Sequence, residues 1–269
     1  MQRILIATKV GISLVFLLYA SWRDYKSREV SNKVWLIYGP IAFTLSLIEY
    51  LLFDFAKLSL FGLSVGFTFL IAFLLFYSGG FGGADSKAFM CIALALPFST
   101  ELLFSPITVN GISPISQVIF PMVIFSNSVL IAAASAIYIL IRNVFQHLKN
   151  RKEFFEGSLK SESFGKKIIV LITGYKIAIS KMQEKWHIYP MEDIEQNNEE
   201  TKRKLIIVPR DEGRDEIINR LNVAIEAKKI SNYVWSTPGL PMLIFVTIGL
   251  IIALLFGDIV WILISLILN

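Results

Sequence analysis

Cysteine and histidine are scarce in this chain of 269 residues. The one cysteine, Cys91, lies inside an apolar stretch, so the sequence has neither a disulfide framework nor a CxxC zinc or redox motif. The two histidines, His147 and His187, stand far apart in polar sequence, which argues against a histidine metal site. We therefore expect no bound metal and no cofactor.

Charged residues are also few, at 17% of the chain, whereas soluble domains carry about 25%. Hydrophobic residues make up 55% and stand in long blocks rather than at helical or strand spacing, which indicates membrane spans. About 20 apolar residues cross a hydrocarbon core of about 30 Å. Six segments have this character: 4–22, 34–53, 60–78, 88–104, 118–141 and 240–268. In the last, Gly257 and Asp258 predict either a tilted helix or a break.

These segments predict an all-α polytopic membrane protein with six transmembrane helices and a small α+β cytoplasmic insertion before the last helix. We expect a membrane domain at 1–141, the insertion at 142–238 and the sixth helix at 239–269. Within the insertion, Leu205–Val208 favours a strand and Asp211–Ile230 a helix. Residues 167–180 are too short to span and favour either a strand–turn–strand unit or a surface helix.

Lysine and arginine are distributed unevenly between the loops. Basic residues gather at 23–33 and 142–238, and Lys87 lies in the loop 79–87, whereas 105–117 has none. Because basic loops stay cytoplasmic, we expect those first three segments inside the cell and both termini outside. A basic excess in a membrane protein favours contact with membrane lipids, so we expect lipid partners and no nucleic acid.

Ionisable residues at membrane depth are functional candidates by default. Asp24 ends the first span and Asp85 begins the fourth, both on the expected cytoplasmic side. Asp85 follows a run of four glycines in five residues, 79–83, which favours a flexible loop that a ligand approaches closely. An ordinary glycine-rich loop, followed by an aspartate that caps the start of a helix and has no catalytic role, explains the same pattern. Asp54, Glu101 and Asp258 are typical of solvated interface residues.

Around the two aspartates the chain resembles the prepilin and archaeal preflagellin peptidases, relatives of the GxGD intramembrane proteases. That family places one catalytic aspartate after the first span and the second in a Gly-x-Gly-Asp motif that opens the fourth. The matching segments here read DYKSREVSN at 24–32 and GGADSK at 82–87. The resemblance implies that Asp24 and Asp85 are catalytic. It also implies a substrate-binding loop made of Gly82, Gly83, Ala84, Lys26 and Lys87.

Three features depart from the family pattern. Ala84 replaces the second glycine of the motif, which would cost about 1 kcal/mol or more if that position required a positive φ. Ser31 stands where proline is common. The loop 23–33 lacks the paired cysteines that accompany the N-methyltransferase activity of the bacterial enzymes. The chain is therefore most similar to the archaeal branch, which has peptidase activity alone.

The resemblance implies a membrane aspartic endopeptidase, active at the cytoplasmic face of the cell membrane. Its substrate would be a preflagellin or prepilin-like preprotein, whose short basic leader (class III signal peptide) it removes. Such a substrate has a small residue at the cut, usually glycine, and then a hydrophobic helix. In this chemistry one carboxylate takes a proton from water while the other, protonated, assists the carbonyl oxygen.

Other functions remain open at this point. Nothing in the sequence separates a flagellin substrate from pilin-like ones. A presenilin-like intramembrane protease is a second possibility, because the run at 238–241, PGLP, is faintly similar to a motif of that group. A turn before a span explains that run equally well. A proton-coupled transporter using Asp24 and Asp85 is the alternative outside enzymes, although transporters favour mid-membrane acids and repeated, broken helices.

Overall fold

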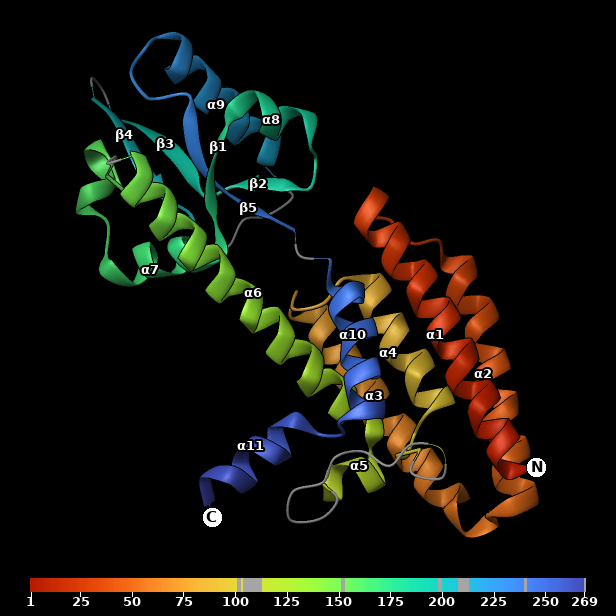
Figure 1. Ribbon diagram of the computed structural model, residues 1–269. Helices are drawn as coiled ribbons and strands as arrows, with labels where there is room; N and C mark the ends of the chain where they lie inside the picture. Colours follow the sequence, from red (N-terminus) through yellow and green to blue (C-terminus); the bar gives the residue numbers. More distant parts are fainter. Residues whose placement is uncertain are drawn as a thin grey trace. The chain divides into compact units, whose positions relative to one another are not determined.

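The computed structural model describes residues 1–100, 103, 113–150, 153–197, 200–207, 213–239 and 241–268 (Figure 1). The chain forms two compact units, one made of residues 1–132 and 241–269 and the other of residues 133–240. We call them the helical unit and the mixed unit. The long helix α6, Phe120–Asn150, contributes its beginning to the helical unit and its end to the mixed unit.

The helical unit contains mostly long apolar helices. Its elements are α1 (Gln2–Ser27), α2 (Asn32–Phe53), the 3-10 helix η1 (Phe55–Lys57), α3 (Leu58–Tyr77), α4 (Gly83–Ala95), α5 (Pro114–Val118), the start of α6, α10 (Met242–Leu255) and α11 (Ile259–Leu268). α1 lies along α2 and also packs against α10, and α4 packs against both α2 and α3 (Figure 1). Leu17, Tyr38 and Ile92 are fully buried where these helices meet.

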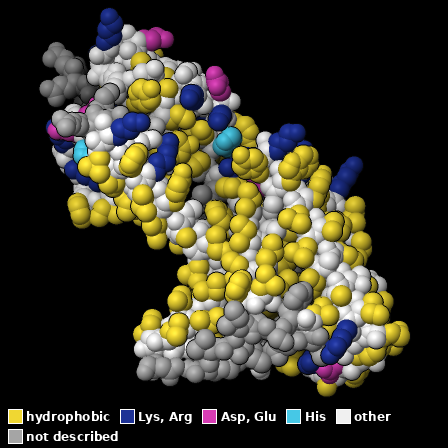
Figure 2. All heavy atoms as spheres, viewed as in Figure 1, with side chains coloured by type: hydrophobic (Ala, Val, Ile, Leu, Met, Phe, Trp, Pro, Cys, Tyr) yellow, Lys and Arg dark blue, Asp and Glu magenta, His cyan; other side chains and the backbone are white. Residues whose placement is uncertain are grey.

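Among the described residues, four helices are long and apolar enough to cross a membrane: α1, α2, α3 and α6. α10 and α11 make a fifth if the bent pair counts as one span. The visible face of the helical unit is covered largely by apolar side chains, with charged ones gathered near its ends (Figure 2). A mostly helical membrane protein with a small sheet is thus confirmed, whereas the prediction of six spans is not.

The expected fourth span, 88–104, differs most from the structure. The helix there, α4, has 13 residues and ends at Ala95, because Leu96 leaves the helical conformation with φ −130°. Leu96 precedes Pro97, and a residue before proline is disfavoured in the helical region. The Pro97 carbonyl accepts hydrogen bonds from Ser64 Oγ and from the backbone N–H of Phe120, both at 3.0 Å. Residues 101, 102 and 104–112, including Glu101, lie outside the described residues.

The last apolar segment is broken at Gly257, as one of the two sequence interpretations proposed. α10 and α11 meet at an angle of 58°, and Gly257 has φ 77°, which favours glycine. The side-chain amide of Asn127 donates to the Gly257 carbonyl at 2.9 Å. Asp258 is buried and accepts a hydrogen bond from Ser113 Oγ at 2.7 Å, so its interpretation as a solvated interface residue is wrong.

The mixed unit contains two small antiparallel sheets and several short helices. The first sheet has the order β1 (Tyr175–Ala178), β5 (Tyr233–Pro238), β2 (Ile188–Pro190), and the second is a hairpin of β3 (Glu192–Asn197) and β4 (Glu200–Leu205). The helices are η2 (Gly157–Ser161), α7 (Phe164–Thr173), α8 (Ile179–Glu184), α9 (Arg214–Glu226) and the end of α6. Met182, Leu221 and Val234 are fully buried between α8, α9 and the first sheet.

The local predictions for this unit have mixed outcomes. The helix expected at 211–230 is present as α9. Residues 167–180 are half helix and half strand, divided at Gly174, where an added Cβ would lie 2.6 Å from Met191 Sδ. The strand expected at Leu205–Val208 lies instead at Glu200–Leu205, because Leu205 pairs with Glu192 across the hairpin. Val208 itself lies outside the described residues.

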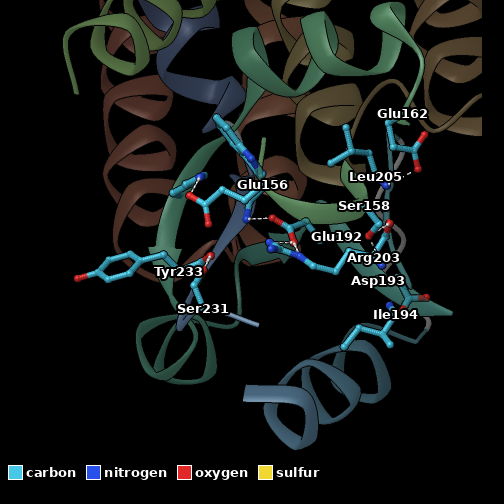
Figure 3. Close-up of polar contacts among 12 residues, drawn as sticks. Glu156, Ser158, Glu162, Glu192, Asp193, Ile194, Arg203, Leu205, Ser231 and Tyr233 are labelled. Carbon is cyan, nitrogen blue, oxygen red and sulfur yellow. Dashed lines mark hydrogen bonds and ion pairs between the residues drawn. The ribbon is translucent and has the colours of Figure 1, made fainter. Parts of the chain in front are cut away.

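A buried ion pair lies within the β3–β4 hairpin of the mixed unit, and its carboxylate also contacts the first sheet (Figure 3). Glu192 is fully buried and Arg203 is 7% exposed. Arg203 Nε donates to Glu192 Oε2 at 2.8 Å, and Arg203 Nη2 donates to the same oxygen. The other carboxylate oxygen, Oε1, accepts from the backbone N–H of Trp235 in β5 at 2.7 Å. The carboxylate of β3 therefore connects its own hairpin to the central strand of the first sheet.

Candidate active site

Asp24 lies in the last turns of α1. Its carbonyl oxygen accepts a hydrogen bond of 3.0 Å from the backbone N–H of Arg28, which ends the helix in a left-handed conformation with φ 55°. The same turn brings the Arg28 side chain near enough for its positive charge to act on the Asp24 carboxyl group. Asp24 Oδ2 is buried and has no hydrogen-bond partner among the described residues. The hydrogen-bonding capacity of this oxygen is therefore not satisfied by the described part of the chain.

Asp85 lies in the first turn of α4. Its Oδ2 accepts a hydrogen bond of 3.0 Å from the backbone N–H of Gly82, the residue that precedes the helix. This bond satisfies one of the donors that a helix leaves free at its start, and it orients the carboxylate. A Cβ at Gly82 would also lie 3.0 Å from Asp85 Oδ2. The glycine thus allows backbone and carboxylate to approach closely.

Ala84 does not strain the motif. It is the second residue of α4 and is not among the residues with positive φ, so the cost considered above does not arise. At Gly83 an added Cβ would lie 3.6 Å from Phe76 Cε2, an ordinary contact. Within 79–83 the requirement for glycine is therefore strongest at Gly79, which has φ 75°, and at Gly82.

The two aspartates form one electrostatic site. Burial and, as a smaller cause, the negative charge of Asp24 raise the pKa of the Asp85 carboxyl to about 7, and the hydrogen bond from the Gly82 N–H opposes the rise. Lys26 and Lys87, which follow the two aspartates by two positions, contact other residues. Lys26 lies over the Trp22 ring, 5.3 Å from its centroid, and Lys87 donates to Asn32 Oδ1 at 2.7 Å. The site therefore combines two carboxyl groups, of which Asp85 keeps its proton up to near-neutral pH.

The start of α10 completes the surroundings of Asp24. Ser21, one turn before Asp24, donates to the Leu243 carbonyl at 2.9 Å and shares a hydrogen bond of 2.7 Å with Thr247 Oγ1. The backbone N–H of Leu243 is directed at the Asp24 carboxyl group. A helix start carries partial positive charge, so it favours an anionic group beside it.

Sequence reasoning named the two aspartates but missed Arg28 and Leu243 as their neighbours. Arg28 follows Asp24 by only four positions, so a neighbour this close in the sequence was detectable. Leu243 is more than 200 positions from Asp24 and contributes a backbone group. No side-chain pattern marks such a residue.

A half-buried pair of carboxyl groups suits hydrolysis. An ionised carboxylate accepts a proton from water, while a neighbouring carboxylic acid donates a hydrogen bond to the carbonyl oxygen under attack. Two close carboxyl groups share one proton more readily than they both ionise, and they titrate as a unit. Asp85 has the raised pKa that the acid requires, and Asp24 has the free oxygen that the base requires.

The chain is similar to known leader peptidases over most of its length. Residues 11–137 match the type IV leader peptidase family, and residues 166–259 match the archaeal peptidase A24 C-terminus type II. A preflagellin peptidase of Methanococcus voltae is 27% identical over 256 residues, which cover 92% of this chain and 94% of that protein. A preflagellin peptidase of Methanococcus maripaludis is 23% identical over 255 residues, with the same coverage of each chain.

Proposed function

Because the chain belongs to the type IV leader peptidase family and is a membrane protease, we propose that Asp24 and Asp85 are its catalytic pair. The substrate would be a preflagellin-type preprotein, whose leader is removed by hydrolysis of one peptide bond. The observation that carries this proposal is the electrostatic coupling of the two carboxyl groups at adjoining ends of α1 and α4.

In this proposal the two aspartates have different roles. Asp85, with a pKa of about 7, is the acid that donates a hydrogen bond to the scissile carbonyl oxygen. Asp24 is the base: its buried and unpaired Oδ2 accepts a proton from the attacking water. Arg28 and the Leu243 N–H hold the Asp24 carboxyl group in place. Gly82, Gly83 and Ala84, with Lys26 and Lys87 nearby, form the loop that receives the substrate backbone.

We further propose that this site opens toward the cytoplasm. The basic loop 23–33 and Lys87 adjoin the two aspartates, and basic loops stay on the cytoplasmic side. A preprotein with a basic leader and a hydrophobic helix keeps its leader on that same side. Both termini of the chain would then lie outside the cell.

Substitution of each aspartate tests the catalytic assignment. Asp24→Asn and Asp85→Asn should each abolish cleavage of a preflagellin-like peptide by the purified protein while leaving its thermal stability near that of the wild type. Glu29→Gln is the matched control, since Glu29 is an exposed carboxylate in the loop after Asp24, and this variant should cleave normally. If either asparagine variant keeps more than a few per cent of activity, that residue is not catalytic.

Thiol labelling tests the orientation separately. Glu195 is exposed, and the one native cysteine, Cys91, is buried. Glu195→Cys should react with an impermeant thiol reagent in lysed cells and stay unreacted in intact ones. Reaction in intact cells would place the mixed unit outside and would overturn the cytoplasmic site, although the catalytic assignment would stand.

A further inference from the structure

The second half of α6 presents a row of large apolar side chains that nothing in the described chain covers. Each is between 40% and 68% exposed. We call this row the α6 stripe; its members are Ile137, Tyr138, Ile141, Val144, Phe145 and Leu148. Contiguous exposed apolar patches of this kind mark sites of interaction with a protein or a membrane.

The spacing places the whole stripe on one side of the helix. Its members recur at intervals of three and four, which at 3.6 residues per turn confines them to an arc of about 120°. The opposite side of α6 packs within the mixed unit. There Asn143 is buried, and its amide donates to the Leu171 carbonyl at 2.9 Å and the Gly174 carbonyl at 2.7 Å. The stripe is therefore the outward face of a helix fixed by its other side.

The charges along α6 have one sign. The helix contains no Asp or Glu, and its Arg142 and Lys149 border the same edge of the stripe, two turns apart. Arg142 lies over the Tyr175 ring, 4.7 Å from its centroid, a cation–π contact that uses none of its N–H donors. An apolar face bordered by cations is typical of helices that lie at the surface of an anionic bilayer.

The length of α6 also favours a lipid bilayer as the partner of the stripe. Its 31 residues extend about 46 Å at 1.5 Å per residue, whereas the hydrocarbon core is about 30 Å thick. About ten residues of α6 therefore extend beyond the hydrocarbon core of the bilayer. Sequence hydropathy places the end of the span near Ile141, so Val144, Phe145 and Leu148 are the stripe members at the level of the headgroups.

We propose that the α6 stripe is a lipid-contact surface. Its apolar side chains enter the boundary between acyl chains and headgroups, and Arg142 and Lys149 bind the phosphates of anionic lipids. A second copy of this chain fits less well, because a two-fold contact through α6 would bring cations together without an acid on the helix to pair with them. A substrate with a basic leader would be repelled by the same two cations.

Site-directed spin labelling tests the contact. In a Cys91→Ala background, nitroxides are attached at Phe145→Cys, at Leu148→Cys and, as matched control, at Val223→Cys on α9, where the apolar side chain is 61% exposed. The full-length protein is placed one copy per nanodisc, in phosphatidylcholine with phosphatidylglycerol. We expect labels 145 and 148 to be several-fold less accessible to a water-soluble nickel chelate than label 223. Equal accessibility at 148 and 223 would overturn the proposal.

Two further comparisons test the lipid charge and the alternative occupant. The protection of label 148 should weaken when phosphatidylglycerol is omitted, and also when Arg142→Gln and Lys149→Gln are combined. The control pair Lys181→Gln and Lys185→Gln, exposed on the mixed unit, should leave it unchanged. If the protection of label 148 changes neither when phosphatidylglycerol is omitted nor with either pair of substitutions, the role of the cations is refuted. Protection seen only with two copies per disc would show a second copy as the occupant and overturn the proposal.

Discussion

Removing the guanidinium of Arg203 should expose the cost of a buried charge in the mixed unit. Arg203→Met keeps much of the length of the side chain but leaves Glu192, which is fully buried, without the cation that is bonded to it; only the weaker effect of the Lys176 charge remains. Breaking one partner of a buried ion pair costs about 3–5 kcal/mol, because the remaining charge stays desolvated. We therefore expect the free energy of unfolding of this unit to fall by that amount near neutral pH.

The double variant Glu192→Gln with Arg203→Met is the control. It removes both charges, and the glutamine carbonyl still accepts a hydrogen bond from the Trp235 N–H, which now bonds to Glu192 Oε1 at 2.7 Å. Replacing both members of a buried pair is often neutral or stabilising. The double variant should therefore be more stable than Arg203→Met alone, although it carries one more substitution.

The loss should also depend on pH. Burial already raises the pKa of the Glu192 carboxyl, and the Arg203 charge opposes that rise. Without Arg203 the pKa in the folded protein lies still further above the unfolded value of about 4.3. Because a raised carboxyl pKa means that stability is lost as pH rises through it, Arg203→Met should be closer to wild type at pH 5 than at pH 8.

Hydrogen exchange of the full-length protein in detergent measures this locally, through the opening free energy of the amides in β3, β4 and β5. A loss below about 1 kcal/mol would place the pair in the range of solvated surface ion pairs. An equal loss at pH 5 and pH 8 would show that Glu192 does not titrate as a desolvated carboxyl group. Either result would refute the reasoning.

Three further predictions concern the helical unit. Cleavage should decline with a slope of one log unit per pH unit above about pH 7, as Asp85 loses the proton it needs as the acid; a pH-independent kcat/KM between 6 and 9 would contradict that role. Gly79→Ala should lower the unfolding free energy by about 1 kcal/mol because Gly79 has φ 75°, whereas the control Gly83→Ala should change it little; equal thermal shifts would contradict this. Thr247→Val removes the hydroxyl that is hydrogen-bonded to Ser21, so the free energy of unfolding should fall by about 1 kcal/mol and kcat should fall as well. Unchanged activity would show that α10 does not contribute to the site.

Sequence alone determined the class of this protein and the location of its candidate site. Hydropathy is a local property of the chain, so the long apolar segments 4–22, 34–53, 60–78 and 118–141 correspond to α1, α2, α3 and α6. The two aspartates stand in short motifs, and motifs are contiguous in sequence. Arg28, four residues after Asp24, was within reach of the same reasoning.

Tertiary structure decided what depends on distant partners. Asp258 is buried and accepts a hydrogen bond from Ser113, which is far away in the chain. The strand β4 lies at Glu200–Leu205 because β3 pairs with it there. The coupling of Asp85 to Asp24 and the approach of the Leu243 N–H likewise come from packing between helices. Such contacts exist only after the chain has brought separate elements together, so the local sequence has no pattern that encodes them.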